Sequence, residues 1–482
     1  MTLNSERNTI VGIFFIGDHQ KMQERIKAIL QRDPSDEIIK AEGWVRTKRD
    51  SKNVCFLEIN DGSSLKGLQV VIDKASFNND DLLSGITTGC SVVCEGHIVA
   101  SLGGNQKVEM QLTGLTLVGE CPVDYPLQKK RHSLEFLRDI AHLRPRTNLL
   151  GAVTRVRNTL AYAVHSFFQE NGFVYVNTPL ITCSDAEGAG ETFQVTTLDI
   201  DKAPRLEDGS VDYSKDFFGK KASLTVSGQL EGETYAMAMK NIYTFGPTFR
   251  AENSNTTKHL AEFWMVEPEM AFCTLEGDME TAESFLKYIF SACLEKNPED
   301  MEFFDQFVLK GNIDTLRHVI EKPFAHMTYT DAIKVLEKEN DHFDFPVHWG
   351  SDIQTEHEKF LTEQVCKAPV IVTDYPKEIK AFYMKLNDDG KTVRGMDVLV
   401  PRIGEIIGGS ERESNLDVLL SRISELGLNR DDYWWYLDLR KYGSVPHSGF
   451  GLGFERAVQY VTGVQNIRDV IPYPRYVKSA DF

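Results

Sequence analysis

Two neighbouring segments, 243–252 and 258–269, hold five residues whose types and spacing could do chemistry. Those residues are Arg250, Glu252, His259, Glu267 and Glu269. We interpret the two segments as strands of a hairpin joined by a polar loop, in which residues two positions apart share one face. An arginine on that face could bind a phosphate, because its planar guanidinium matches phosphate oxygens. A ladder of structural ion pairs would use the same residues, so the hairpin alone leaves both interpretations open.

Glycines alternate in a third segment, at Gly449, Gly451 and Gly453. In an extended strand they leave one face as bare backbone, which a flat ring or a phosphate could approach closely. Arg456 follows near the start of a predicted helix over 455–461, where its charge would point at the same place. The spacing matches neither a Walker A loop nor a dinucleotide fingerprint, because no Gly-Lys-Ser/Thr follows and no βαβ unit surrounds it.

The elements that must position these residues indicate an α+β domain. From Leu143 onward, helical and strand-like segments mix without regular βαβ alternation, which favours an antiparallel sheet flanked by helices. Apolar spacing predicts a helix over 147–169, and the segment 172–179 reads as a strand that ends in proline.

Short alternating strands precede this domain. They are predicted over 41–47, 54–60, 68–73, 91–100 and 106–118. Five short strands within about eighty residues indicate a small closed barrel of the OB type. Alternation places Phe56 on the outer face and Gln69 outward on the next strand. An exposed aromatic beside amides can stack single-stranded bases, although a loop that covers Phe56 would explain the pattern equally well.

Length and composition are those of a multidomain globular protein, with 482 residues and 41% hydrophobic residues. No run approaches about 18 apolar residues, so we expect a cytoplasmic protein with no membrane partner. The predicted domains are an N-terminal extension with one helix over 19–31 (1–37), an OB-fold domain (38–120), a linker (121–142) and the α+β domain (143–482).

The formal net charge of −18 argues against unspecific coating of nucleic acid, and no DNA partner is expected. An RNA partner would have to meet a local basic patch. The stretch 129–146 is a candidate, because six of its residues are basic and two are acidic. A solvated surface is the plainer interpretation of such a short charge run.

In their order along the chain, the segments 147–179, 243–269 and 446–456 resemble motifs 1, 2 and 3 of class II aminoacyl-tRNA synthetases. An OB barrel ahead of that domain is similar to the aspartyl, asparaginyl and lysyl subgroup. Within the subgroup the motifs look like those of the asparaginyl members, since the aspartyl members carry proline where this chain has Gly228 and aspartate where it has Glu267. The resemblance implies a ligase that joins L-asparagine to ATP and then passes the acyl group to the 3′ end of tRNA(Asn).

For ATP, the resemblance implies two catalytic arginines. Arg250 would bridge the α-phosphate and the substrate carboxylate, and Arg456 would meet the γ-phosphate. Further ATP contacts are expected from Glu252, His259, Glu405, Gly451 and Gly453.

Mg²⁺ is implied as well, and it prefers hard oxygen ligands. Glu405 is the first expected ligand. Asp397, across the turn 401–404, is the second, with a possible offset of one residue from the aspartyl pattern.

For the amino acid, the resemblance implies that Arg412 reaches the side-chain oxygen. Glu187, Ser227 and Gln229 would hold the α-amino end. Glu267 is expected to accept a hydrogen bond from the amide and to repel an aspartate carboxylate. The other interpretation makes Glu267 a structural partner of Arg412 or of another cation.

The family resemblance also implies a homodimer built on 147–179 and an anticodon contact through Phe56 and Gln69. Three alternatives remain: an aspartyl-tRNA synthetase, a paralogous enzyme that amidates aspartate, and a non-catalytic RNA-binding paralogue. The barrel counts against the amidating enzyme, which needs no base-stacking module. A non-catalytic paralogue would be expected to lose Arg250, Glu405 or Arg456, and all three are present.

Overall fold

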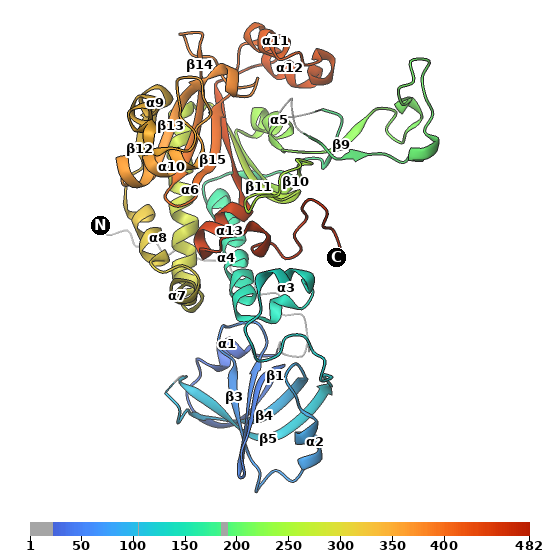
Figure 1. Cartoon of the computed structure of the whole chain (residues 1–482), viewed down its shortest axis with the longest axis vertical. Helices are drawn as coiled ribbons and strands as arrows, with labels where there is room; N and C mark the ends of the chain where they lie inside the picture. Colours follow the sequence, from blue (N-terminus) through green and yellow to red (C-terminus); the bar gives the residue numbers. More distant parts are fainter. Residues whose placement is uncertain (1–22, 105, 185–190) are drawn as a thin grey trace, which may run out of the picture. The chain divides into compact units, whose positions relative to one another are not determined.

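The computed structural model describes residues 23–104, 106–184 and 191–482 (Figure 1). The chain divides into two compact units, Met1–His132 and Ser133–Phe482. Among the described residues, none of the helices combines the length and the apolar character needed to cross a membrane.

The first unit is a closed barrel with strand order β1-β2-β3-β5-β4, drawn in blue in Figure 1. Strands β3 and β5 run parallel and the other neighbours are antiparallel. Alternate side chains such as Cys55 and Leu57 of β2 and Val70 of β3 fill its core. The elements are α1 (Ile26–Ile29), β1 (Ser35–Asp50), β2 (Val54–Asn60), β3 (Leu68–Asp73), α2 (Asp80–Gly85), β4 (Ser91–Ala100) and β5 (Val108–Gly119). The predicted OB-type barrel is confirmed.

Two N-terminal predictions need correction. The helix expected over 19–31 covers only Ile26–Ile29 within the described residues, and residues 1–22 lie outside them. A residue outside the helix stabilises its first turn, because the Ile26 amide donates to the Asp61 carboxylate at 3.1 Å. Strand β1 is longer than predicted. A bulge between Val45 and Thr47 lets this one strand pair with both β2 and β4, which closes the barrel.

The second unit is built on an eight-stranded sheet with order β12-β13-β14-β15-β16-β11-β10-β6. Its central pairs are antiparallel, as predicted, and only the outermost pairs β12-β13 and β10-β6 are parallel. The strands are β6 (Val174–Tyr175), β10 (Asn241–Phe249), β11 (Glu262–Ala271), β12 (Ala325–Thr328), β13 (Val370–Pro376), β14 (Thr392–Val400), β15 (Gly404–Glu411) and β16 (His447–Gly453). A small second sheet has the order β7-β9-β8, from β7 (Ile181–Thr182), β8 (Gln194–Val195) and β9 (Ala222–Leu224).

Helices cover the large sheet on both sides. On one side, α4 stacks Phe168 on Tyr243 of β10, and α6 brings Phe285 against Phe450 of β16. On the other side, α5 packs against β10 and β11. The helices are α3 (Leu134–Asp139), α4 (Asn148–Glu170), α5 (Gln229–Met239), α6 (Leu275–Lys296), α7 (Pro298–Phe307), α8 (Asn312–Glu321), α9 (Tyr329–Leu336), α10 (Thr355–Phe360), α11 (Leu416–Glu425), α12 (Trp434–Lys441) and α13 (Phe454–Thr462).

The predicted helix over 147–169 matches α4, but the strand expected over 172–179 is much shorter. Only Val174–Tyr175 forms β6, which pairs in parallel with the edge of β10. After Val176, whose amide still donates to Tyr243, the chain leaves the sheet and reaches β7.

The basic stretch 129–146 does not form one exposed patch. Arg138 donates two hydrogen bonds to Asp469, at 2.9 and 2.6 Å. Arg144 is buried and donates to the carbonyl oxygens of Ile471 and Pro472 at 2.6 and 3.1 Å. Both arginines therefore fasten the C-terminal segment of the second unit and are unavailable to an RNA backbone.

Candidate functional site

A cavity of about 210 Å³ opens where β11, β15 and β16 meet the loop after β10. Seven of the residues predicted from the sequence line it together: Arg250, Glu252, His259, Glu405, Gly451, Gly453 and Arg456. The three segments that carry them are far apart in the chain, so the sheet brings the predicted nucleotide site together.

Arg250 and Glu252 reach the cavity from a loop, not from a strand face as predicted, because β10 ends at Phe249. The Arg250 amide donates to the Ala261 carbonyl at 3.0 Å, which closes the loop at its base. The Arg250 guanidinium lies 5.5 Å from the ring centroid of Phe263 on β11. This cation–π contact holds the charge over the strand that carries Glu267.

Arg456 stands in the first turn of α13, as predicted. Its Nη1 donates to the backbone carbonyl of Glu405 at 3.0 Å and lies 3.6 Å from the Glu405 carboxylate. Lys258 lines the same cavity and was missed. Its Nζ donates to Thr355 Oγ1 at 2.9 Å, and burial lowers its pKa. A lysine in a polar loop gives no signal in the sequence that separates it from an ordinary surface residue.

The alternating glycines leave less bare backbone than predicted. A Cβ on Gly449 would lie 2.5 Å from the Glu269 carboxylate, and one on Gly451 would lie 2.8 Å from the Met265 methyl group. Gly453 is the open position, since its nearest neighbour would be Arg456 Cβ at 3.8 Å. Because the Pro268 carbonyl oxygen would lie even closer, at 2.4 Å, glycine at 449 is required by the backbone and a carboxylate of the neighbouring strand.

Asp397 and Glu405, the two expected Mg²⁺ ligands, approach each other over Gly408. A Cβ there would lie 3.2 Å from Glu405 Oε1 and 3.6 Å from Asp397 Oδ1. The β14–β15 pairing has a register shift between Val398 and Leu399. Asp397 accepts hydrogen bonds from Lys380 Nζ at 2.8 and 3.0 Å.

Glu358 of α10 lies beside Gly404, next to Glu405, and the sequence did not indicate it. Burial, together with the neighbouring carboxylates of Glu405 and Asp397, raises its pKa to about 7. Its carboxylate occupies the space beside Gly404, where a Cβ would lie 2.0 Å from Glu358 Oε2. The turn that carries Glu405 is therefore packed directly on Glu358.

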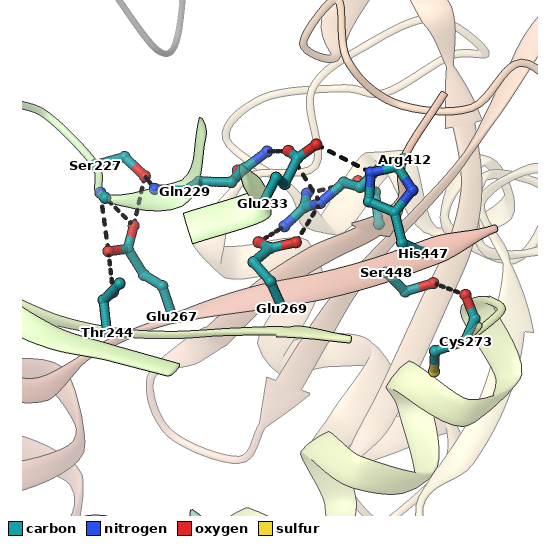
Figure 2. A network of polar contacts seen from close by, with 12 residues as sticks. Ser227, Gln229, Glu233, Thr244, Glu267, Glu269, Cys273, Arg412, His447 and Ser448 are labelled. Atoms are coloured by element: carbon teal, nitrogen blue, oxygen red, sulfur yellow. Dashed lines mark hydrogen bonds and ion pairs between the residues drawn. The ribbon is translucent and has the colours of Figure 1, made fainter. Parts of the chain in front are cut away.

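Beside the cavity, the residues that are predicted to bind the substrate amino acid form a buried polar network (Figure 2). Glu267 accepts hydrogen bonds from the hydroxyls of Ser227 and Thr244 and from the Gly228 amide, the last two at 2.8 and 3.0 Å. The Gln229 amide in turn donates to Ser227 Oγ at 3.1 Å. The partners of Glu267 are thus neutral donors, which argues against the interpretation that it pairs with Arg412.

Glu269, two residues further along β11, is the partner of Arg412. Arg412 Nε and Nη2 both donate to Glu269, the first at 3.2 Å, while Nη1 donates to Ser410 Oγ at 2.8 Å. Burial raises the pKa of Glu269, and the two hydrogen bonds from Arg412 oppose that rise because they favour the ionised carboxylate. The sequence had marked Glu269 only as a second carboxylate on the face of Glu267.

The remaining predicted residues lie elsewhere. Glu187 lies outside the described residues. Phe56 is half-buried on the outer face of the barrel, where the Arg49 guanidinium lies 5.4 Å from its ring centroid. Gln69 accepts a hydrogen bond from Arg49 at 3.2 Å and donates to Glu109 at 2.8 Å. Arg49 and Glu109 thus join Phe56 and Gln69 in one cluster on that face.

Comparison with known families matches both units. Residues 133–477 match the family model "tRNA synthetases class II (D, K and N)". Residues 39–118 match the model "OB-fold nucleic acid binding domain". A class II synthetase domain with an OB-fold domain ahead of it is therefore the class of protein that the fold and the site define.

Curated relatives specify the family further. The asparagine–tRNA ligase of Acetivibrio thermocellus is 60% identical over 464 residues, 96% of this chain and 100% of its own. That of Synechocystis sp. is 60% identical over 461 residues, 95% of this chain and 100% of its own. The solved structure of Pyrococcus horikoshii asparaginyl-tRNA synthetase complexed with asparaginyl-adenylate has a TM-score of 0.83 at 32% identity, covering 95% of this chain and 99% of that one. The chain belongs to the class II tRNA synthetases of the D, K and N group, and within that group to the family of asparagine–tRNA ligases.

Asp278 of α6 is fully buried near Arg412 and Glu269, and neither carboxyl oxygen has a hydrogen-bond partner among the described residues. Burial raises its pKa well above the ordinary value; Arg412 opposes this, and Glu269 and Glu411 add to it. The folded protein therefore holds a proton on Asp278 that the unfolded chain releases. This contribution to stability is complete below the unfolded pKa and is lost as the pH rises through the folded pKa.

We therefore expect Asp278→Asn, which needs no such proton, to gain stability over the wild type as the pH rises. The two should be similar near pH 4, and the difference should grow by at most about 1.4 kcal/mol per pH unit. Urea unfolding between pH 4 and 8 measures it, with the exposed Asp314→Asn as control. A difference that stays constant with pH would show that Asp278 is ionised in the fold.

Proposed function

We propose that the protein activates L-asparagine with ATP and transfers it to tRNA(Asn). The observation that carries the proposal is the junction of two sites on one sheet. The cavity lined by Arg250 and Arg456 adjoins the buried network of Glu267 and Arg412 along β11. The aspartyl alternative is not favoured, since the curated relatives at 60% identity are asparagine–tRNA ligases.

In the first step, a carboxylate oxygen of asparagine bonds to the α-phosphorus of ATP, the bond to the bridging oxygen breaks, and pyrophosphate leaves. This step needs alignment and charge neutralisation more than proton transfer. Arg250 would meet the α-phosphate and the attacking carboxylate. Arg456, whose guanidinium is held by a hydrogen bond to the Glu405 carbonyl, would meet the γ-phosphate. Glu252 and His259 would complete the ATP contacts from the loop after β10.

Mg²⁺ fits the carboxylates of Asp397 and Glu405, because both are hard oxygen ligands that converge where Gly408 leaves room. No cluster of three or more His, Cys, Asp or Glu suited to a metal occurs among the described residues, so phosphate oxygens and water would complete the coordination. The ion would neutralise phosphate charge. Lys380, paired with Asp397, holds that carboxylate in place when no ion is bound.

For the amino acid, Arg412 would donate to the side-chain oxygen, and Ser227 and Gln229 would hold the α-amino end together with Glu187. Glu267 would accept from the amide NH₂. An aspartate carboxylate would instead face Glu267 as like charge in a site that excludes water.

For tRNA, the cluster around Phe56 on the outer face of the barrel offers a ring for stacking and an amide for a base edge. Gln69 is oriented by its bonds to Arg49 and Glu109, which favours a defined hydrogen-bonding direction. The setting for this reaction would be the cytoplasm.

A homodimer would cover the edge of the large sheet at β6. Exposed apolar side chains gather on and beside that strand, namely Tyr162, Val174, Tyr175, Leu180 and Ile181. An edge strand with apolar neighbours is a surface that proteins usually cover.

Arg250→Ala and Arg456→Ala should each lower the rate of asparagine-dependent ATP–pyrophosphate exchange by about 100- to 1000-fold, as loss of one preorganised donor to the reacting phosphates does. The fold should remain intact by circular dichroism. Arg317→Ala, an exposed arginine on α8, is the control. Near-normal exchange in either cavity variant would refute its role.

Glu267→Gln should lower kcat/KM for asparagine and narrow the preference over aspartate, because the amide loses its anionic acceptor and the carboxylate loses its repulsion. Pyrophosphate exchange with each amino acid measures both effects. Exposed Glu299→Gln should change neither. Full asparagine activity with undiminished rejection of aspartate would place the discrimination elsewhere.

Phe56→Ala should raise the KM for tRNA about tenfold or more, since stacking of one base on an aromatic ring is worth about 1–3 kcal/mol. Asparagine-dependent pyrophosphate exchange should not change. The exposed Phe307→Ala serves as control. Unaltered aminoacylation kinetics would mean that Phe56 is no tRNA contact.

Light scattering at micromolar concentration should give twice the chain mass of 54.6 kDa. Val174→Asp with Ile181→Asp should shift the protein toward the monomer, because charge would be buried at the covered edge. Phe307→Asp, exposed on α7, should leave the mass unchanged. A monomeric wild type would disprove the dimer.

A further inference from the structure

We propose that Glu233 of α5 is a positioning residue that sets both ends of the amino-acid pocket, and that its charge contributes to the rejection of aspartate. The inference rests on the proposed activation of asparagine and extends it to a residue outside the three motifs.

Glu233 is completely buried, and each of its oxygens has two partners. Oε1 accepts hydrogen bonds from Gln229 Nε2 at 3.1 Å and from the Tyr436 hydroxyl at 2.9 Å. Oε2 accepts from Arg440 Nη2 at 3.0 Å and lies 3.0 Å from His447 Nε2. Its orientation is therefore fixed by α5, α12 and β16 together.

The two residues that Glu233 joins serve opposite ends of the amino acid. Gln229 belongs to the α-amino end and lies one helical turn before Glu233 on α5. Arg412 belongs to the side-chain end, and its Nε lies 3.9 Å from Glu233 Oε1 (Figure 2). A displacement of this one carboxylate would move both groups relative to each other.

Glu233 is ionised in this setting. Burial opposes its charge, but Arg440, His447 and Arg412 outweigh burial and hold its pKa well below the ordinary range. Two buried carboxylates, Glu233 and Glu269, thus face two buried guanidinium groups, Arg412 and Arg440.

This balance has a consequence for selectivity. Arg412 can donate a hydrogen bond to a substrate oxygen, but its positive charge is already matched by Glu269 and Glu233. A neutral amide needs no more than the hydrogen bond. An aspartate carboxylate would enter without a free cation and would meet Glu267 close by, so its desolvation would not be compensated.

Glu233→Gln tests both the positioning role and the role of the charge. It keeps the shape of the side chain, removes its charge and weakens the hydrogen bond from Gln229. We expect kcat/KM for asparagine in pyrophosphate exchange to fall by about 10- to 100-fold, mainly through KM, as for a misplaced binding group. The KM for ATP should not change. The asparagine-to-aspartate ratio of kcat/KM should narrow about tenfold, since the variant leaves a surplus positive charge beside Arg412.

Tyr436→Phe is the matched control, since it removes one hydrogen bond to Glu233 and keeps the charge. Its asparagine-to-aspartate ratio should equal that of the wild type. A Glu233→Gln variant that loses activity with both amino acids equally, or that raises the KM for ATP in parallel, would overturn the proposal and leave Glu233 a purely structural group.

If Glu233→Gln alone does not fold, the double variant Glu233→Gln with Arg440→Gln carries the test, because it removes one charge of each sign. The KM for asparagine should remain raised while the ratio to aspartate returns toward the wild-type value. A wild-type KM in the double variant would refute the positioning role. The wild-type protein assayed in parallel separates the two claims, since absence of asparagine-dependent exchange there would refute the proposed function itself.

Discussion

Carboxylates that stay ionised when buried from water must find donors within the protein, and this constraint shapes the second unit from its sheet to its pockets. Glu455 shows it most directly. Its two oxygens accept from Arg157 of α4 at 2.6 Å and from the Trp264 amide of β11 at 2.8 Å. One carboxylate of α13 thereby joins all three motif segments. Glu267 and Glu269, two residues apart on β11, follow the same rule. Glu267 accepts hydrogen bonds from neutral donors, and Glu269 accepts them from a guanidinium. That difference gives the two carboxylates different chemistry.

Much of the architecture could be predicted because its signals are local. Period-two alternation and turn residues gave β2, β3 and β4 with the observed bounds, and helical apolar spacing gave α4 within a residue at each end. The sequence also predicted that Arg250, Glu405 and Arg456 come together, and they line one cavity. Arg250 and Arg456 belong to motifs whose order along the chain resembles that of the class II synthetases. The family carried this part of the prediction, and the hairpin alone would have left an ion-pair ladder equally open.

Sequence could not predict the partner that each charged residue takes across the sheet. Strand order decides that Glu269 fills the space over Gly449, and no local pattern gives strand order. The same holds for Arg138 and Arg144, whose partner Asp469 is more than three hundred residues away. Glu233 was not predicted, although the sequence could have indicated it, because Gln229 and Glu233 stand four residues apart on one helix face.

The position of β16 in the sheet bears on how the polypeptide is made. This strand lies between β15 and β11, in the interior of the sheet, yet it is formed by residues His447–Gly453, close to the C-terminal end of the sequence. Its two neighbours cannot be joined until residues 447–453 have been synthesised, after every other strand of the sheet. The barrel, by contrast, is finished within the first quarter of the chain and can fold while the rest is still being synthesised. The cavity lined by residues from Arg250 to Val477 is therefore completed later in synthesis than the barrel.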